Sequence, residues 1–572
     1  MTSITRALPA ALVAVLVAMP GMADAGRSTR WSPERWQKKL SQPRYTEIEQ
    51  TNYYIEAADG TQLSLTVFLP AGLEANKRIP TLLEISPYQP LDRGLSPGGS
   101  LITDWRMFVE RGAAYVEADA RGTMGSEGCL DFGGSADRAD AKTFAEWIRS
   151  QDWSNDVIVT DGISHPGMGS VVAHTSIPNL SAALAHAPVV SYYQDEWLQG
   201  AKFEDQFNGP AYEAIEMAPS TYPDPEAVTA QPATCRGKTT MDYSPIDGPF
   251  TDMWADRDLS RHTPKAKVPV LLTHGFIDQN VHPDHSQMYW DALPDDYPKY
   301  AIFGWWYHGW PDMHGYPGVT AFDLIRHRWL DTALFGINNG LWAEPRVLVE
   351  DSKGVWHEGD DWPIEPSKWV TFYPSKDGGF ENVKPKAGSV SYLDDVPSYR
   401  GEWIDASAVF RSKPLSGPRL INGQPIVNLR ASSDQTSTKW VAYLIDEAPD
   451  GTWERIAHGY ADSHTWGKEE DWLEIEPGKA YEWTLKMLST AVVVDKGHRI
   501  TLVIASQDSS NVSTSDLCWD DYRGGCYNPS GILPATTAGR ATNTIEIGPR
   551  ATRVRWAWVD PAATRKPPWA TP

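Results

Sequence analysis

The stretch "TDGISHPGMGS", residues 160–170, decides the fold because it carries the chain from a strand into a helix through a serine. The apolar run "DVIVT" is typical of a buried strand, and Gly162 permits a tight turn after it. Ser164 lies at the apex, and Pro166 suits the first turn of a helix, where its missing N–H costs nothing. The pattern predicts a nucleophile elbow, with a serine that merely caps a helix as the alternative.

Segments on both sides of this turn alternate between strand and helix patterns. Helical spacing of apolar residues marks "SADRADAKTFAEWIRSQ", and "YYIEAADGTQLSLTVFLPA" alternates around Asp-Gly as a hairpin does. Short apolar runs predict buried strands at "IPTLLEISPY", "GAAYVEADARG", "SAALAHAPVVS", "VPVLLTHGFID" and "YAIFGWWYH". This alternation predicts a parallel sheet covered by helices on both faces.

A chain of 572 residues is too long for one core, so two or three domains are expected. We predict that residues 46–191 and 265–340 form one domain around this parallel sheet. Residues 192–264 interrupt the strand pattern and predict a helical cap over the ligand-binding edge of the sheet. From residue 343 to residue 562, short alternating segments predict a C-terminal all-β sandwich or jelly roll.

A nucleophilic serine needs a base, and the base needs an orienting acid, both expected at the ends of later strands. The run "VPVLLTHGFID" ends at Asp278, and "YAIFGWWYH" ends at His308. One helix, predicted at "PDHSQMYWDALP", fits between them. Taken alone, each residue has an alternative: Asp278 as a helix cap or turn residue, and His308 as a solvated loop residue. Their joint occurrence in the order serine, acid, histidine favours a catalytic triad.

Two groups are candidates for the oxyanion hole. The side chain of His165 should diverge from Ser164 at a tight turn, which makes it a weaker base, but its backbone N–H would point toward the oxyanion. Tyr88 follows an early buried strand. Enzymes with a nucleophile elbow supply the second hydrogen-bond donor of the oxyanion hole from this position. An ordinary half-buried tyrosine is the alternative.

Composition excludes several classes of partner. The formal net charge of −23 argues against binding of nucleic acid or anionic lipid through a general basic surface. No Cys-x-x-Cys motif or histidine-rich cluster suggests a metal, and no cofactor is expected. A homo-oligomer stays open, because no sequence feature decides the oligomeric state.

The N-terminus has the pattern of an export signal. Arg6 precedes an apolar run, and "ADAG" offers a cleavage site after Ala25. A membrane anchor is the alternative, but the run is short and ends in small residues. We therefore expect residues 1–25 to be removed and the mature chain to be secreted or periplasmic, without a membrane span.

The chain has four cysteines, an even number that permits two disulfides in an oxidising compartment and so agrees with export. Cys518 with Cys526 would close a small loop, and Cys129 would then pair with Cys235. Free buried thiols are the alternative.

An ordered set of motifs resembles the serine hydrolases that include X-prolyl dipeptidyl peptidases, cocaine esterase-type (CocE/NonD) hydrolases and α-amino acid ester hydrolases. The matching pieces are "DGTQLSLTVFLP", "ISPY", "DARGTMGSEG", "DGISHPG", "HGFIDQNV", "YHGW", "NNGLWAEPRVLVED", "PDGTWERIAHGYAD" and "KGHRITLVIAS". The resemblance implies a Ser–Asp–His triad on an α/β-hydrolase domain, a helical cap and a C-terminal jelly roll.

Carried over by motif, the resemblance makes Ser164 the nucleophile, Asp278 the acid and His308 the base, with Tyr88 and the His165 N–H as oxyanion donors. The family places its nucleophile in G-x-S-Y-x-G, which accounts for the late glycine of "GISHPG". A histidine stands where a tyrosine is usual, a departure that leaves the backbone N–H intact.

The segment after the acid indicates the branch of the family. Asn280 and Val281 resemble the X-prolyl dipeptidyl peptidases, in which this asparagine and a cap glutamate hold the substrate's free N-terminus. The best matches to that glutamate are Glu204 or Asp205, with rivals in Asp195 and Glu196 and solvated cap charges as the alternative.

The expected function is a secreted serine hydrolase that releases Xaa-Pro dipeptides from peptide N-termini through an acyl-enzyme. The substrate would be a peptide or a small ester or amide. An esterase or an α-amino acid ester hydrolase (β-lactam acylase) of the same family is the first alternative. A catalytically inactive carbohydrate-binding protein is the second.

Overall fold

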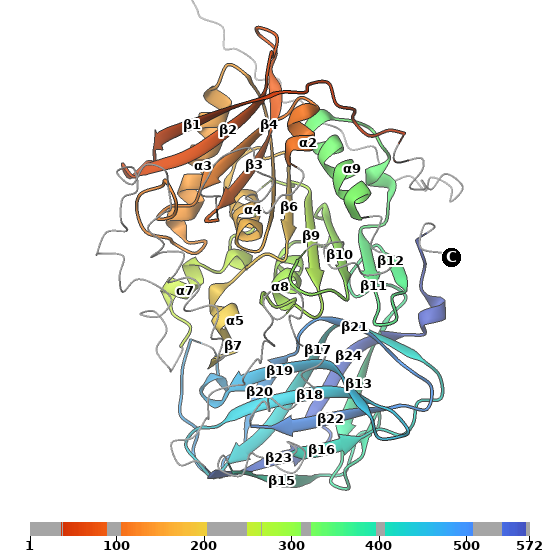
Figure 1. The fold of residues 1–572 in the computed structure, drawn as a ribbon. Coiled ribbons are helices and arrows are strands. Elements are labelled where there is room, and N and C mark those ends of the chain that lie inside the picture. The colour runs from red at the N-terminus through yellow and green to blue at the C-terminus, as the bar shows by residue number, and fades with distance from the viewer. Residues whose placement is uncertain are drawn as a thin grey trace, which may run out of the picture.

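The structure is a computed structural model that describes residues 36, 38–88, 105–202, 249–264, 266–278, 280–309, 322–395, 407–468, 470–506 and 540–567, without the side chains of Glu196, Lys202 and Asp395. Figure 1 shows a twisted sheet flanked by helices and, beneath it in this view, an all-β part. Within the described residues, no helix is long and apolar enough to cross a membrane.

A ten-stranded mixed sheet forms the first part. Its spatial order is β1 (Ile48–Glu56), β2 (Gln62–Pro70), β4 (Ala114–Asp119), β3 (Ile79–Ser86), β5 (Ser154–Ile163), β6 (Ala182–His186), β9 (Val270–Gly275), β10 (Lys299–Gly304), β11 (Val347–Glu350) and β12 (Trp356–Gly359). The strands from β4 to β11 pair in parallel, whereas β1, β2 and β12 join antiparallel. The predicted α/β class is confirmed, with an antiparallel hairpin added at one edge.

The end of this sheet differs from the predicted domain boundary. Residues after 343 were expected in the C-terminal domain, but β11 pairs in parallel with β10, and β12 pairs with β11. The reason is local, because a short apolar strand such as "VLVE" reads alike in a buried parallel sheet and in a β sandwich. The separate all-β part begins with β13 (Lys368–Pro374).

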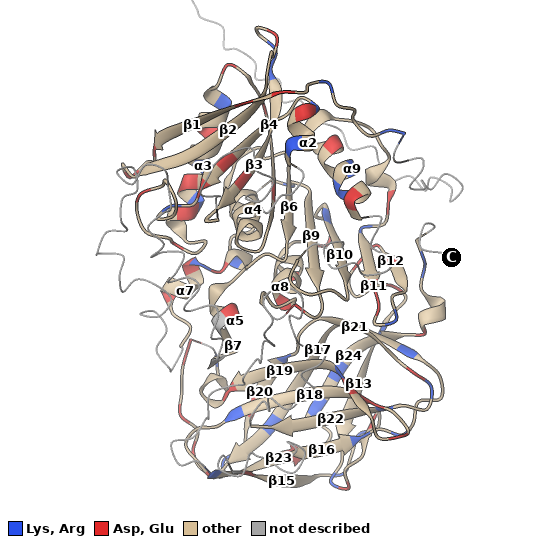
Figure 2. Ribbon diagram, in the orientation of Figure 1, with Lys and Arg blue, Asp and Glu red and all other residues tan. Residues whose placement is uncertain are grey.

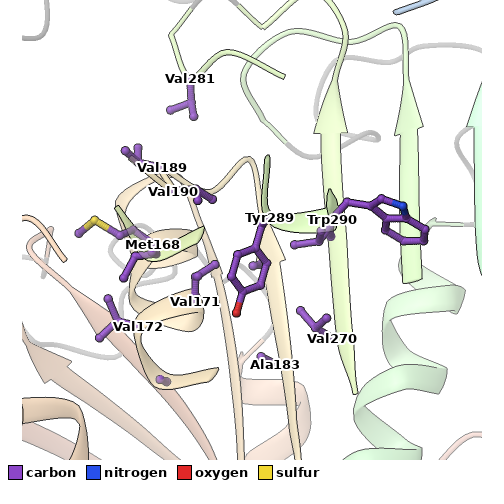
Figure 3. Packing of buried hydrophobic residues seen from close by; sticks show 14 of the residues in the cluster. Met168, Val171, Val172, Ala183, Val189, Val190, Val270, Val281, Tyr289 and Trp290 are labelled. Atoms are coloured by element: carbon purple, nitrogen blue, oxygen red, sulfur yellow. The ribbon is translucent and has the colours of Figure 1, made fainter. Parts of the chain in front are cut away.

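Helices cover both faces of the sheet, as the alternation predicts. On one face, α3 (Ser135–Ser150), α4 (His165–Ser176) and α8 (Asp284–Ala292) share one apolar core with the sheet. On the other face, α2 (Trp105–Glu110) and α9 (Phe322–Phe335) share a second core. Figure 3 shows the first core around α4, where Met168 and Val171 pack near Val189 and Tyr289. Because α4 is buried along most of its length, its position is fixed by packing.

The described part of the predicted cap is small and aromatic. It holds α5 (Tyr192–Glu196), β7 (Trp197–Leu198), β8 (Ala201–Lys202), α7 (Asp252–Asp256) and the 3-10 turn η1 (Leu259–Arg261), while residues 203–248 lie outside the described residues. The ring of Tyr193 contacts those of Trp197 and Phe250. In Figure 1, α5 and α7 lie between the sheet and the all-β part.

Two antiparallel sheets enclose a separate core in the C-terminal part. The larger contains β13, β14 (Phe380–Glu381), β15 (Gly388–Asp395), β17 (Arg419–Ser433), β20 (Tyr481–Lys486), β21 (Thr490–Val494), β23 (Arg540–Ile547) and β24 (Arg553–Val559). The smaller contains β16 (Ala408–Arg411), β18 (Lys439–Glu447), β19 (Trp453–Asp462) and β22 (Arg499–Ala505). Short 3-10 turns are η2 (Leu341–Ala343), η5 (Ser463–Thr465) and η7 (Pro561–Ala563).

The two parts share apolar contacts. Leu420 and Val493 of the all-β part belong to the core beneath α4 and α8, and the Trp305 indole N–H donates to the Ala491 carbonyl at 2.8 Å. Trp305 directly follows β10, so this interface supports the loop that carries His308.

Candidate active site

Ser164 occupies a strained backbone position between β5 and α4. Its φ of 65° and ψ of −127° lie in a region that side-chain-bearing residues rarely adopt. The Ser164 N–H donates to the His186 carbonyl at 2.9 Å, and the Ser164 carbonyl accepts from the Met168 N–H at 3.0 Å. These bonds hold the strained turn, and the half-buried side chain lies at the carboxyl edge of the sheet.

Two glycines permit this turn because a methyl group would not fit at either. A Cβ on Gly162 would lie 2.3 Å from the Pro166 carbonyl oxygen, and a Cβ on Gly167 would lie 2.5 Å from the His186 carbonyl oxygen. Both values are far below an ordinary contact, so the spacing G-x-S-x-x-G follows from the close approach of α4 to β5 and β6.

A buried ionic network lies beneath the turn. The Arg326 guanidinium, from α9, donates to Asp161 Oδ2 through Nε at 2.9 Å and Nη2 at 2.5 Å. His186 Nε2 donates to Asp161 Oδ1 at 3.0 Å, and its Nδ1 is hydrogen-bonded to the Thr273 hydroxyl at 2.7 Å. Burial alone would raise the pKa of Asp161, but the Arg326 charge and the His186 hydrogen bond hold that pKa below its ordinary value. The network joins β5, β6 and β9 to α9 directly behind the serine.

The structure brings Asp278 and His308 together. His308 Nδ1 lies 2.8 Å from Asp278 Oδ2, and Asp278 Oδ1 accepts the N–H groups of Asn280 at 2.9 Å and Val281 at 3.0 Å. Burial alone would raise the pKa of Asp278, but the charge of His308 and hydrogen bonds from two histidines hold that pKa well below its ordinary value. The ionised carboxylate therefore holds a proton on His308 Nδ1, so in the neutral ring Nε2 is the nitrogen that accepts a proton.

Ser164, Asp278 and His308 lie at the same edge of the sheet because β5, β6, β9 and β10 run in parallel (Figure 1). The loop after β10 folds back over β9, since a Cβ on Gly275 would lie 1.9 Å from the Trp306 carbonyl oxygen. Chemically, the edge holds a strained serine and an imidazole oriented by a buried carboxylate.

His274 is a partner of Asp278 that the sequence did not reveal. It lies within β9, where its Nε2 is 2.8 Å from the Val281 carbonyl and its Nδ1 is 2.7 Å from the Ser286 hydroxyl. Because a carbonyl only accepts, Nε2 carries the proton, and this nitrogen also lies 3.5 Å from Asp278 Oδ2. A histidine inside a strand carries no sequence signal for this role.

Tyr88 lies where the sequence places an oxyanion donor. It follows β3, and its hydroxyl is hydrogen-bonded to Ser164. Burial raises the pKa of Tyr88, the negative charge of Asp195 raises it further, and the bond to Ser164 only partly offsets both. The phenol therefore stays protonated at neutral pH and can donate.

His165 is placed beside this tyrosine. The two rings meet edge to face with centroids 6.0 Å apart. Burial lowers the pKa of His165 to about 3, so its ring is neutral at physiological pH. Its backbone N–H belongs to the first turn of α4, as an oxyanion donor requires.

Of the candidates for binding the substrate's ammonium group, the structure describes some side chains and not others. Asp195 is buried in α5, and its charge acts on Tyr88. Asn280 is half-buried beside Asp278. The Glu196 side chain, Glu204 and Asp205 lie outside the described residues.

The predicted export signal and three of the four cysteines also lie outside the described residues. Residues 1–25 lie outside the described residues, and so do Cys235, Cys518 and Cys526. Cys129 is described and is not a free thiol. Both disulfide pairings stay predictions.

Family profiles match both parts of the chain. Residues 59–310 match the X-Pro dipeptidyl-peptidase (S15 family), and residues 339–515 match the X-Pro dipeptidyl-peptidase C-terminal non-catalytic domain. The first match spans the strand ends that carry Tyr88, Ser164, Asp278 and His308.

Similar proteins include both peptidases and esterases. A predicted Xaa-Pro dipeptidyl-peptidase of Streptomyces avermitilis is 26% identical over 76% of this chain and 74% of its own length. Cocaine esterase of Rhodococcus sp. is 23% identical over 80% of this chain and 90% of its own length.

Solved structures share the fold across both parts. An aminopeptidase from a Thaumarchaeota archaeon matches with a TM-score of 0.69 at 18% identity, covering 94% of this chain and 99% of that one. An α-amino acid ester hydrolase matches with a TM-score of 0.66 at 18% identity, covering 90% of this chain and 98% of that one.

Proposed function

Since this chain belongs to the X-Pro dipeptidyl-peptidase (S15) family, we propose that it is a serine hydrolase that cleaves Xaa-Pro dipeptides from peptide N-termini. The observation that carries this proposal is the His308–Asp278 pair at 2.8 Å, on the strand edge that also carries the strained Ser164. A serine, an oriented imidazole and a buried carboxylate are the groups that acyl transfer requires.

In the proposed reaction, Ser164 Oγ attacks the carbonyl carbon of the proline residue, and His308 Nε2 takes the proton of the serine hydroxyl. The developing oxyanion accepts hydrogen bonds from the Tyr88 hydroxyl and the His165 N–H. His308 then gives its proton to the leaving amine as the C–N bond breaks. Water, deprotonated by His308, attacks the acyl-enzyme, and the ester bond to Ser164 breaks as His308 returns the proton to Ser164 Oγ, which releases the dipeptide.

We further propose that Asp195 binds the substrate's α-ammonium group. It is buried, and its charge raises the pKa of Tyr88, which supports a place for the carboxylate on the same side of the site. A carboxylate at a fixed distance from Ser164 would select a free N-terminus two residues from the scissile bond. We propose that Asn280 also binds this ammonium group. Glu204 and Asp205 stay candidates through the family resemblance.

A specific observation favours a second candidate function, esterase or β-lactam acylase activity. The cocaine esterase match covers 90% of that protein, more than the peptidase match covers of its own. The triad and oxyanion groups would serve ester cleavage equally well, so the substrate-binding groups decide between the two functions.

A substrate panel separates these functions. Gly-Pro and Ala-Pro anilides, simple esters and ampicillin-type amides would be compared with wild type and Ser164→Ala. We expect turnover of the prolyl anilides that Ser164→Ala abolishes. Fast ester turnover without prolyl anilide cleavage would assign the esterase function instead.

We also propose that residues 1–25 direct export, so that the mature enzyme acts outside the cytoplasm, where the two predicted disulfides could form.

A further inference from the structure

His285 is a buried histidine that the proposed reaction does not use. It lies in α8, its ring is fully buried, and its Nε2 is 3.3 Å from Oδ1 of Asp195 in α5. Figure 2 shows that α5 carries acidic ribbon close to α8, near the carboxyl edge of the sheet. The contact joins two elements that are far apart in the sequence.

The backbone fixes which nitrogen of His285 carries the proton. The N–H groups of Val190 and Ser191 lie 3.1 Å and 3.4 Å from His285 Nδ1. A backbone N–H can only donate, so Nδ1 is the acceptor and the proton is on Nε2. Burial lowers the pKa of His285, and nearby carboxylates offset this only partly, which keeps the ring neutral.

The Nε2–H group therefore faces the Asp195 carboxylate as a neutral donor. Within the described residues, Nε2 completes no well-aligned hydrogen bond, although the carboxylate oxygen is within reach. Burying an N–H without a full hydrogen bond costs about 1–3 kcal/mol, so the contact with the carboxylate offsets part of this cost.

The same histidine also fixes the turn that carries Asp195. Ser191, whose N–H faces His285 Nδ1, caps α5, because its carbonyl accepts the Asp195 N–H at 3.1 Å and its hydroxyl accepts the Gln194 N–H at 3.5 Å. One imidazole thus contacts both the backbone at the start of α5 and the carboxylate at its end.

We propose that His285 is a positioning residue that orients the Asp195 carboxylate toward the α-ammonium group of the substrate. This inference rests on the proposed function of Asp195. A neutral donor restricts the carboxylate without cancelling its charge, whereas a lysine or arginine would compete with the ammonium for it. A contact with a neutral donor leaves the negative charge of Asp195 in place.

Two substitutions separate the two contacts of the ring. His285→Gln places an amide N–H near the position of Nε2 but loses the acceptor for the backbone of Val190 and Ser191. His285→Asn keeps an acceptor near Nδ1 but loses the donor to Asp195. Each variant would be assayed as the full mature chain on Gly-Pro p-nitroanilide, which has a free amine, and on p-nitrophenyl acetate, which has none.

We expect His285→Asn to raise KM for the anilide about tenfold, because it removes the donor that faces the Asp195 carboxylate, with ester turnover within about twofold of wild type. His285→Gln should lower the melting temperature but keep KM for the anilide within about threefold. The ester reports an intact Ser164 site, so it also controls for misfolding.

Equal losses on both substrates, or an unchanged KM in His285→Asn, would overturn the positioning role. Asp195→Asn distinguishes that failure from failure of the proposed function. If Asp195→Asn removes the preference for the free amine but His285→Asn does not, only the role of His285 is wrong. If Asp195→Asn leaves the preference intact, the assignment of Asp195 and the inference built on it are both overturned.

Discussion

The close approach of α4 to β6 can be tested by adding a single methyl group at Gly167. A Cβ there would lie 2.5 Å from the His186 carbonyl oxygen, and an ordinary contact begins near 3.4 Å. Gly167→Ala must therefore move α4 or β6 by about 0.9 Å, at a cost of about 1–3 kcal/mol in folding free energy. The carbonyl that is pushed is the one that accepts the Ser164 N–H at 2.9 Å.

The expected consequence is a misplaced nucleophile. A displacement near 1 Å at reacting atoms costs about 10² in rate, so kcat/KM on Gly-Pro p-nitroanilide should fall by about that factor. The assay compares initial rates and thermal melting of Gly167→Ala with those of wild type. Gly417→Ala is the matched control, because its Cβ would meet only the Arg419 guanidinium, at 3.7 Å. If Gly167→Ala keeps kcat/KM within about twofold of wild type, the reasoning from the glycine contact is refuted.

Three further substitutions test the groups around the serine. Asp278→Asn should lower kcat by about 10⁴, measured on prolyl anilides, because an amide cannot hold the required imidazole tautomer. The pKa of Asp278 is lowered on folding, so its stabilising effect is complete above pH about 4 and is lost as the pH falls further. Urea midpoints should therefore fall more steeply for wild type than for Asp278→Asn as the pH falls from about 4 to about 2. Tyr88→Phe should lower kcat/KM by about 10²–10³ with little change in melting temperature, since it removes one oxyanion donor. Arg326→Met should cost about 3–5 kcal/mol in urea unfolding, because it leaves the buried Asp161 carboxylate without its guanidinium partner. Unchanged unfolding would show that the Arg326–Asp161 pair does not support the elbow.

Local patterns in the sequence predicted the elements that carry the proposed triad. Buried parallel strands read as continuous apolar runs, and the residues at their carboxyl ends lie at one edge of the sheet. The sequence could therefore predict Asp278 and His308 at the edge that carries Ser164. The spacing of Gly162 and Gly167 could be read only through the family resemblance, yet the close carbonyl contacts now give its physical cause.

Contacts between distant segments were beyond the sequence. His274 and His285 carry no local mark, because their partners are set by how β9, α8 and α5 pack. The same holds for Arg326, which reaches Asp161 across 165 residues. β11 was assigned to the wrong sheet because a short apolar strand does not specify its partner.

The central claim is that Ser164 is an activated nucleophile. It is tested most directly by treating the folded protein with a fluorophosphonate probe and identifying the modified peptide by mass spectrometry. We predict a single adduct on Ser164, absent in Ser164→Ala and strongly slowed in His308→Gln, whose side chain cannot serve as the base. A folded, unlabelled wild-type protein, or an adduct on another serine, would contradict the account.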